Sequence, residues 1–146
     1  MKNLITKACW LSLLLLGLTL SSCKEDNQAK AERLVNEYLQ ENLNDPSSYE
    51  CIKMGKLGKI TPMIVALVSI EKGCKERGYP NDSINILLER FKLMQEKAGK
   101  DPYSTMGWEL SHKYRAKNAF GGYIITKCKY ILDKDITHIE SVETEK

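Results

Sequence analysis

Two alternating segments in the final third of the chain constrain the fold most strongly. Residues 108–117 and 123–132 alternate apolar with polar side chains, and two glycines stand in the loop between them. Alternation of this period on both sides of a glycine-bearing loop predicts a β-hairpin. With the loop centred near Phe120, we expect residues to pair when their numbers sum to about 240.

This pairing sorts the side chains of the hairpin into two faces. The first face is largely apolar and contains Trp108, Leu110, His112, Tyr114 and Ala116 together with Ile124, Thr126, Cys128, Tyr130 and Leu132. The second face collects the cations Lys113, Arg115, Lys117, Lys127 and Lys129. A slip of one residue in one strand would mix the two sets, so their clean separation favours this register.

Two segments before the hairpin have the apolar spacing of helices. In residues 29–43 one face is formed by Ala31, Leu34, Val35, Tyr38 and Leu39. In residues 82–99 the inner stripe is formed by Ile84, Leu87, Leu88 and Phe91. Apolar residues that recur three and four positions apart predict amphipathic helices in both segments.

The remaining segments are less regular. Residues 49–57 alternate loosely and predict a strand, which Gly55 weakens. The segment 60–77 is rich in β-branched residues and fits either a buried strand or a helix. The pair Thr61-Pro62 favours the helix, because threonine is a good N-cap and proline suits the first helical position. Residues 133–139 allow a short extra strand.

Together these elements predict an α+β fold in one domain, residues 29–140. We expect the N-terminal helix and one or two further helices to pack on a small antiparallel sheet that includes the C-terminal hairpin. The last residues, 141–146, are rich in glutamate and are expected to form a frayed tail.

The N-terminal segment has the three zones of a secretory signal. Lys2 and Lys7 give a positive start, the thirteen residues from Ala8 to Leu20 are almost all apolar, and the small residues Ser21 and Ser22 follow. Signal peptides have an apolar stretch of about 7–15 residues. A membrane-spanning helix needs about 20. We therefore expect residues 1–22 to be removed.

The end of this segment resembles the lipobox of bacterial lipoproteins. Leu20-Ser21-Ser22-Cys23 has the leucine and two small residues that precede the modified cysteine in that family. The resemblance implies diacylglyceryl transfer to Cys23, cleavage before it and a membrane anchor, with residues 23–28 as the tether. The alternative is an ordinary signal peptide with an incidental cysteine.

The next three residues refine the expected location. Lys24, Glu25 and Asp26 resemble the lysine-plus-acids tag of surface-exported lipoproteins in Bacteroidetes-type bacteria. The resemblance implies lipid anchoring in the outer membrane with exposure at the cell surface. A charged, solvated linker between lipid and domain would have a similar sequence.

Composition excludes several functions. Removal of residues 1–22 takes the net charge from +3 to +1, whereas nucleic-acid-binding domains have a strong basic excess. Beyond Cys23 the thiols are Cys51, Cys74 and Cys128, an odd number that permits at most one disulfide within the chain. Their spacing does not match zinc sites. We expect neither a metal nor a cofactor, and no motif of a hydrolase or a phosphate loop occurs.

Two candidate sites remain in the hairpin. The cationic face predicts an anion-binding surface for an envelope protein or an anionic glycan, although lysines also occupy solvated sheet faces that resist aggregation. The alternative is a small hydrolase or thiol enzyme, because the pairing puts His112 opposite Cys128 and histidine can activate a thiol. Both would lie under the helices, where histidine more often serves packing. We therefore expect a binding or accessory protein without enzymatic activity.

A wider resemblance supports the lipoprotein assignment. Asp45-Pro46-Ser47-Ser48-Tyr49-Glu50 after a helix, with the later segment from Tyr114 to Tyr123, resembles small uncharacterised lipoproteins of Bacteroidetes-type bacteria. The resemblance spans most of the chain after residue 22. It implies no activity and no functional residue.

Overall fold

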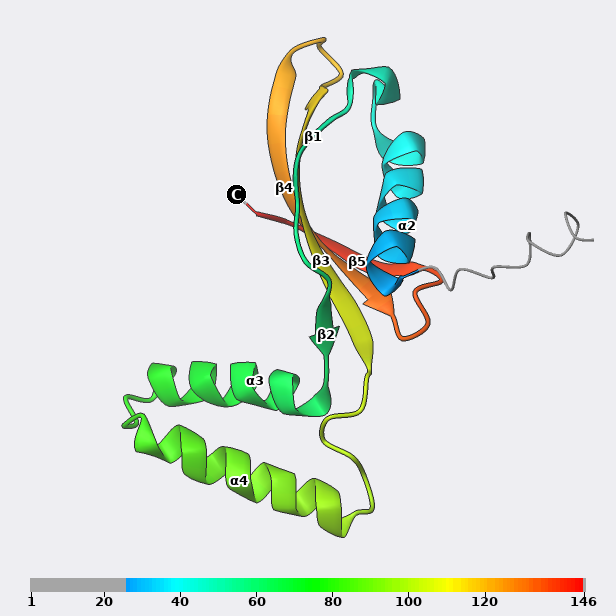
Figure 1. Ribbon diagram of the computed structural model, residues 1–146. Coiled ribbons are helices and arrows are strands. Elements are labelled where there is room, and N and C mark those ends of the chain that lie inside the picture. Colours follow the sequence, from blue (N-terminus) through cyan, green and yellow to red (C-terminus); the bar gives the residue numbers. More distant parts are fainter. Residues whose placement is uncertain (1–25, 146) are drawn as a thin grey trace, which may run out of the picture.

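The computed structural model describes residues 26–145 and contains helices and strands in one connected arrangement (Figure 1). In chain order the elements are α2 (Asn27–Asn42), the 3-10 helix η1 (Pro46–Ser48), β1 (Glu50–Met54), β2 (Gly58–Ile60), α3 (Pro62–Glu76), α4 (Asp82–Lys97), β3 (Gly107–Lys117), β4 (Tyr123–Asp133) and β5 (Ile139–Glu145). The α+β class and the C-terminal hairpin are confirmed.

The sheet is antiparallel and is built around β3 and β4. Its strand order is β1-β3-β4-β5, and β2 pairs with the other end of β3. In the hairpin, Trp108 pairs with Leu132 and His112 with Cys128, which confirms the predicted register along its whole length. The alternation of apolar and charged side chains therefore sets the pairing of these two strands.

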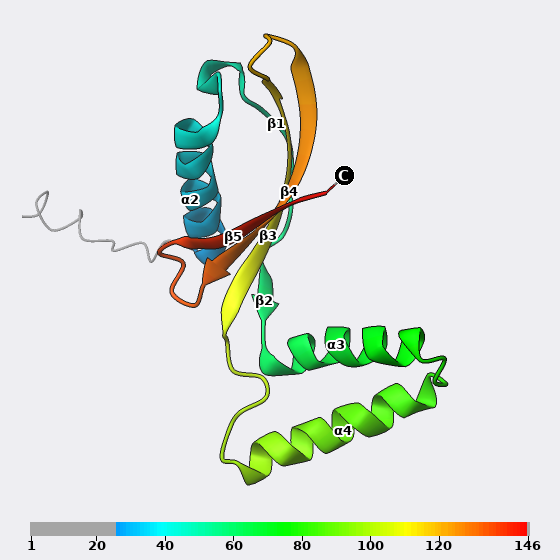
Figure 2. The ribbon, with the colours of Figure 1, turned by 180° about the vertical axis from the view of Figure 1, so that it is seen from behind.

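Helix α2 covers one face of this sheet (Figures 1 and 2). Its residues Ala31, Val35 and Leu39 are buried against strand residues that include Leu110 and Tyr130. Burial of each large apolar side chain contributes about 1.5–3 kcal/mol, so this layer supplies much of the stability of the fold. The opposite face of the sheet carries no helix in the described chain.

The predicted strand at residues 49–57 is two strands, β1 and β2, with a break after Met54. Gly55 lies so close to β3 that an added Cβ would stand 2.9 Å from the carbonyl oxygen of Ser111. Helix α2 fastens the break: Gln28 Nε2 donates to the Gly55 carbonyl, and Leu57 N donates to Gln28 Oε1 at 2.7 Å. The close approach of Gly55 to β3 leaves no room for a side chain at the break between β1 and β2.

The uncertain segment 60–77 forms the helix α3. The hydroxyl oxygen of Thr61 accepts a hydrogen bond from Ile64 N at 3.3 Å, and Pro62 occupies the first turn. Helices α3 and α4 pack against each other and project beyond the end of the sheet as a helical arm (Figures 1 and 2). Their position differs from the expected packing on the sheet, because their apolar stripes face each other instead.

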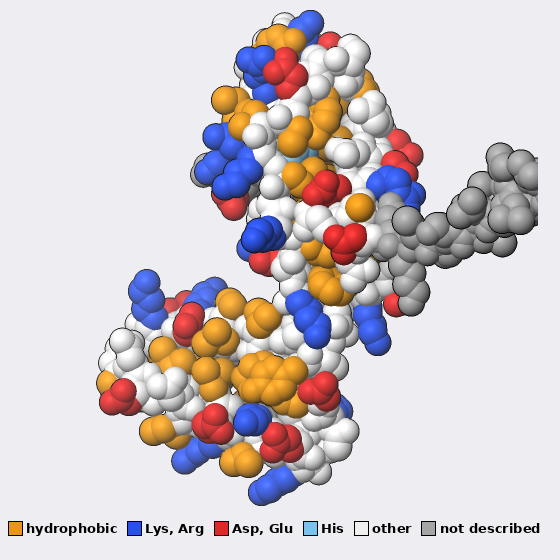
Figure 3. Space-filling model, viewed as in Figure 1, with side chains coloured by type: hydrophobic (Ala, Val, Ile, Leu, Met, Phe, Trp, Pro, Cys, Tyr) orange, Lys and Arg blue, Asp and Glu red, His pale blue; other side chains and the backbone are white. Residues whose placement is uncertain are grey.

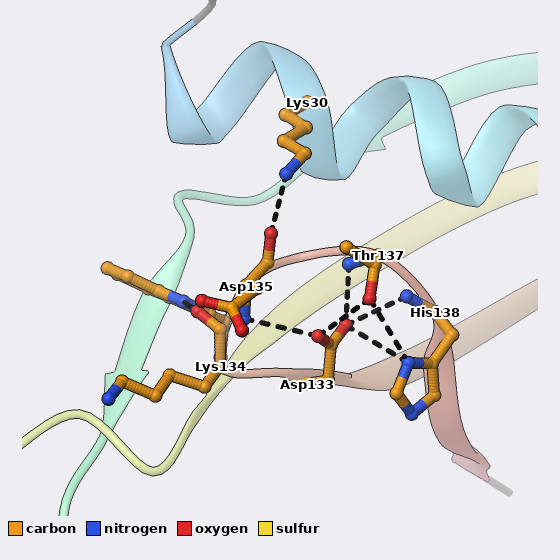
Figure 4. A network of polar contacts seen from close by, with 7 residues as sticks. Lys30, Asp133, Lys134, Asp135, Thr137 and His138 are labelled. Carbon is orange, nitrogen blue, oxygen red and sulfur yellow. Dashed lines mark hydrogen bonds and ion pairs between the residues drawn. The ribbon is translucent and has the colours of Figure 1, made fainter.

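The turn between β4 and β5 is organised by Asp133 (Figure 4). Its carboxylate accepts hydrogen bonds from the backbone N–H groups of Asp135, Thr137 and His138, and from the Thr137 hydroxyl. Within this turn Ile136 is buried and has a φ of 54°, a conformation that costs a β-branched residue energy. The turn directs the chain back along β4.

The expected frayed tail is wrong for residues 141–145, which belong to β5. Glu143 and Glu145 of this strand stand opposite Lys129 and Lys127 of β4. Opposite charges across neighbouring strands stabilise pairing, and Ile139 and Val142 add contacts with the core.

Candidate functional site

Three lysines stand in one row across the open face of the sheet. Lys53 of β1 pairs with Lys113 of β3, and Lys113 pairs with Lys127 of β4. Directly opposed residues have Cβ atoms about 4.5–5.5 Å apart, so three amino groups are concentrated on three neighbouring strands. We refer to Lys53, Lys113 and Lys127 as the lysine row.

A β-bulge brings Lys53 into this row. Glu50 pairs with Arg115 and Cys51 with Tyr114, and the register then shifts before Lys53. Without the shift Ile52 would stand opposite Lys113. Because a bulge adds one residue to one strand, it moves the lysine to the open face.

The five predicted cations all belong to this face, but four of them are paired with carboxylates. The pairs are Arg115 with Glu50 at 2.6 Å, Lys117 with Asp45 at 3.9 Å, Lys127 with Glu145 at 3.9 Å and Lys129 with Glu109 at 3.6 Å. Carboxylates of the strands and of the residue before η1 therefore neutralise most of the predicted positive surface.

Lys53 and Lys113 differ from the other cations. Among residues 26–145, neither amino group has an Asp or Glu partner within 4 Å. Lys127 has only Glu145, at 3.9 Å. The centre of the lysine row therefore carries uncompensated positive charge.

The lysine row borders a shallow depression of about 270 Å³. Besides the three lysines it is lined by Gly55, Ser111, His112, Cys128 and Glu145. Gly55 keeps this part of the floor free of a side chain, and Ser111 adds an exposed hydroxyl. Figure 3 shows Lys and Arg side chains gathered on the side of the upper lobe that faces away from α2. The depression is open and three lysines line it, so it suits part of an extended anionic ligand.

The alternative site places His112 opposite Cys128 as predicted, but the two side chains have different partners. His112 Nε2 lies 3.2 Å from the Tyr49 hydroxyl, whereas Cys128 Sγ lies 3.7 Å from Thr144 Oγ1. Both residues are buried, with 2% and 5% of their surface exposed. Neither group is open to a substrate on the covered face.

The surroundings of His112 are aromatic. Its ring packs against those of Tyr49, Tyr114 and Tyr130. Burial lowers the pKa of His112, and the carboxylate of Glu32 on α2 opposes this effect only in part. In the described chain, His112 Nδ1 and the Tyr130 hydroxyl have no hydrogen-bond partner. This cluster is a neutral part of the core.

Other chemical features are limited in the described range. No group of three or more His, Cys, Asp or Glu residues between positions 26 and 145 could hold a metal ion. Cys51, Cys74 and Cys128 are free thiols there. None of the helices described is long and apolar enough to cross a membrane.

The predicted lipidation site and most of the export tag lie outside the described residues. These are Cys23, Lys24 and Glu25. Asp26 is described: it is exposed, and its carbonyl oxygen accepts a hydrogen bond from Lys30 N at the start of α2.

Comparison with known proteins gives no relative. No protein-family model, curated protein or solved structure matches this chain.

Proposed function

We propose that this protein is a lipid-anchored envelope lipoprotein that binds an anionic partner through the lysine row, without catalysing a reaction. The anchor is Cys23, and the expected location is the cell surface side of the outer membrane. The partner is an acidic envelope protein or an anionic glycan.

The lysine row is the observation that supports binding. Like charges directly opposite each other in a sheet are destabilising, and Lys53, Lys113 and Lys127 form two such pairs in succession. An anion placed over Lys113 would offset the repulsion on both sides. The neighbouring cations of this face are paired with carboxylates of the fold. In the described chain Lys53 and Lys113 have no such partner, so an external anion would bind most favourably beside them.

The anchor is supported by sequence. Leu20-Ser21-Ser22-Cys23 follows directly after an apolar run of signal length. Several acyl chains hold a protein stably on a membrane, since each buried CH₂ contributes about 0.8 kcal/mol. An anchored protein that meets a polymer at a surface needs little affinity per site, because many copies act together.

The test replaces the lysine row. In residues 24–146 we would change Lys53, Lys113 and Lys127 to Gln together and measure binding to dextran sulfate by calorimetry, with neutral dextran as a blank. We expect the affinity to fall at least about tenfold, which corresponds to about 1.4 kcal/mol. We also expect wild-type binding to weaken as salt is added, because exposed charges are screened.

A matched control removes the same charge elsewhere. Lys72, Lys75 and Lys97 lie on the helical arm, and changing all three to Gln should leave binding within about twofold of wild type. Equal losses in the two triple variants would mean that only net charge matters. Wild-type protein that does not bind the sulfated polymer, or a lysine-row variant that binds it normally, would overturn the proposed site.

A further inference from the structure

Two large apolar side chains stand on the open face of the sheet, between the hairpin loop and the lysine row. In order from the loop, the side chains that β4 places on this face are Tyr123, Ile125 and Lys127. Tyr123 is 52% exposed and Ile125 is 62% exposed. The solvated face of an antiparallel sheet usually carries polar side chains, so these two neighbours indicate a surface that contacts a ligand.

The ring of Tyr123 is positioned by two cations of β3. The guanidinium carbon of Arg115 lies 4.9 Å from the ring centroid, and the amino nitrogen of Lys117 lies 5.6 Å from it. Cations at these distances are attracted to the face of an aromatic ring. Arg115 is itself fixed, because its Nη2 atom donates to both carboxylate oxygens of Glu50, at 2.6 and 2.7 Å. The tyrosine ring is therefore ordered before a ligand binds, which lowers the entropy cost of binding.

The positioned ring and the lysine row are parts of one extended surface. Tyr123 and Lys127 are four residues apart on the same strand, which corresponds to about 13 Å. Ile125 lies between them on the same face. A ligand that contacts the whole surface must therefore be elongated, with negative charge over the lysine row and an apolar side over the ring.

We propose that the ligand of the lysine row is an anionic glycan, and that Tyr123 is the platform on which one of its sugar rings stacks. This inference rests on the proposed function and chooses between its two classes of partner. The face of an aromatic ring carries partial negative charge, which attracts the C–H groups on one side of a sugar ring. Acid groups further along the glycan then bind the lysine row.

An acidic protein fits this surface less well. The centres of protein–protein interfaces are depleted in lysine, whereas three lysines form the centre of this surface. Extended peptides often bind at a sheet edge through free backbone groups, but Lys113 and Lys127 belong to strands that are paired on both sides at these positions. The depression beside them is open, so it offers no enclosed pocket for an anchoring side chain. Stacking of a sugar ring needs neither an edge nor a pocket.

The experiment compares two tyrosines of nearly equal exposure. Tyr103, in the connection between α4 and β3, is 53% exposed and lies outside the sheet. In residues 24–146 we would prepare Tyr123→Ala, Tyr123→Phe and Tyr103→Ala. Calorimetry would measure their binding to dextran sulfate, a polyanion made of sugar rings, and to poly-glutamate, a polyanion without rings.

For dextran sulfate we expect Tyr123→Ala to lower the affinity about fivefold, and the other two variants to stay within about twofold of wild type. Poly-glutamate contacts the lysine row through charge alone, so Tyr123→Ala should bind it as the wild type does, which also shows that the variant is folded. Normal binding of dextran sulfate by Tyr123→Ala would overturn the proposal. So would an equal loss for both polymers, or a wild type that prefers poly-glutamate at equal concentration of charge, as an acidic protein partner requires.

The same measurements separate this inference from the proposed function. A lysine-row variant that still binds dextran sulfate normally would overturn both. If the lysine-row variant loses binding and Tyr123→Ala does not, the anion-binding function stands and only the sugar platform is refuted.

Discussion

At the scale of single residues, the core of the sheet contains a buried histidine, and its burial lowers its pKa. His112 is 2% exposed, and it faces Tyr49, Tyr114, Tyr130 and the strand partner Cys128. Its Nδ1 atom has no hydrogen-bond partner among the described residues, so a proton added to this nitrogen would have no acceptor. A charged imidazole in this place costs free energy that the unfolded chain does not pay.

The stability of the fold should therefore fall as the pH falls below about 6.5. Because burial lowers the pKa of His112 in the folded state, the unfolded chain takes up the proton first. The contribution of His112 to the free energy of unfolding is fully present above the ordinary histidine pKa. As the pH falls from there towards the lowered pKa of the folded state, this contribution decreases by at most about 1.4 kcal/mol per pH unit. Denaturant unfolding between pH 7.5 and pH 5 would measure this slope.

Two variants identify the histidine responsible. His112→Gln should flatten the pH dependence, even if it lowers the stability at pH 7.5. His138 is exposed in the β4–β5 turn, with its Nδ1 atom 3.5 Å from Asp133 Oδ1, and His138→Gln serves as the comparison variant because it leaves the buried histidine in place. A slope that persists in His112→Gln would refute the assignment.

At the scale of elements, the β4–β5 turn decides whether β5 joins the sheet. Burial alone would raise the pKa of Asp133, but hydrogen bonds from the backbones of His138, Thr137 and Asp135 and from the Thr137 hydroxyl hold the pKa well below its usual 3.8. The carboxylate thus stabilises the fold fully above that ordinary value, and the contribution is lost as the pH falls below it towards the lowered pKa.

Replacement of the Asp133 carboxylate should weaken the pairing of β5 with β4. We expect Asp133→Ala to lower the free energy of unfolding by about 2–3 kcal/mol, because four partly buried donors lose a charged acceptor. Hydrogen exchange should quicken at amides of β5 more than in the β3–β4 hairpin. Asp135→Ala removes an exposed carboxylate from the same turn and should change stability by less than about 0.5 kcal/mol. Equal effects of the two changes would show that Asp133 does not organise the turn.

The sequence predicts those elements whose pattern repeats. The hairpin register follows from alternation, α2 follows from the spacing of Ala31, Val35 and Leu39, and the start of α3 follows from Thr61 and Pro62. The strand β5 is missed because its partners are distant. From the sequence alone, Glu143 and Glu145 predict a solvated tail, because the sequence does not show that Lys129 and Lys127 stand opposite them.

The candidate site was predicted only in outline. Alternation places five cations on one face, but it does not reveal the carboxylates that β1 and β5 bring beside them. It also misses Lys53, because a bulge has no signal in this segment beyond the nearby Gly55. The local pattern thus assigns the cations to the correct face. Pairing with segments that are distant in the sequence then decides which of these cations have a carboxylate beside them.

At the scale of the whole molecule, α2 relates the proposed anchor to the rest of the fold. Lys30 Nζ donates to the carbonyl of Asp135, so the first turn of α2 lies at the β4–β5 turn. Beyond its last turn, Ser48 Oγ accepts a hydrogen bond from Lys117 N near the hairpin loop. A helix of this length spans about 24 Å, so the start of α2 and the hairpin loop lie towards opposite ends of this part of the fold (Figure 1).

Only four residue steps join Cys23 to Asn27, and an extended chain of that length reaches at most about 14 Å. A lipid on Cys23 would therefore keep the first turn of α2 and the adjoining β4–β5 turn close to the membrane and so restrict the orientation of the fold. The lysine row belongs to the face of the sheet that α2 does not cover, so this tether leaves it open to a surface polymer.

This orientation depends on the lipid, which an intact mass of the protein extracted from its native membranes would test. We expect the mass of residues 23–146 plus a diacylglyceryl group, with or without a further acyl chain on the new amine. In a Cys23→Ser variant, lipid attachment and cleavage at this site should both be lost. The mass of an unlipidated chain, or one that retains Met1 to Ser22, would contradict the anchor. The lysine row would then act in a secreted or signal-anchored protein, free of the constraint that the short tether imposes on its orientation.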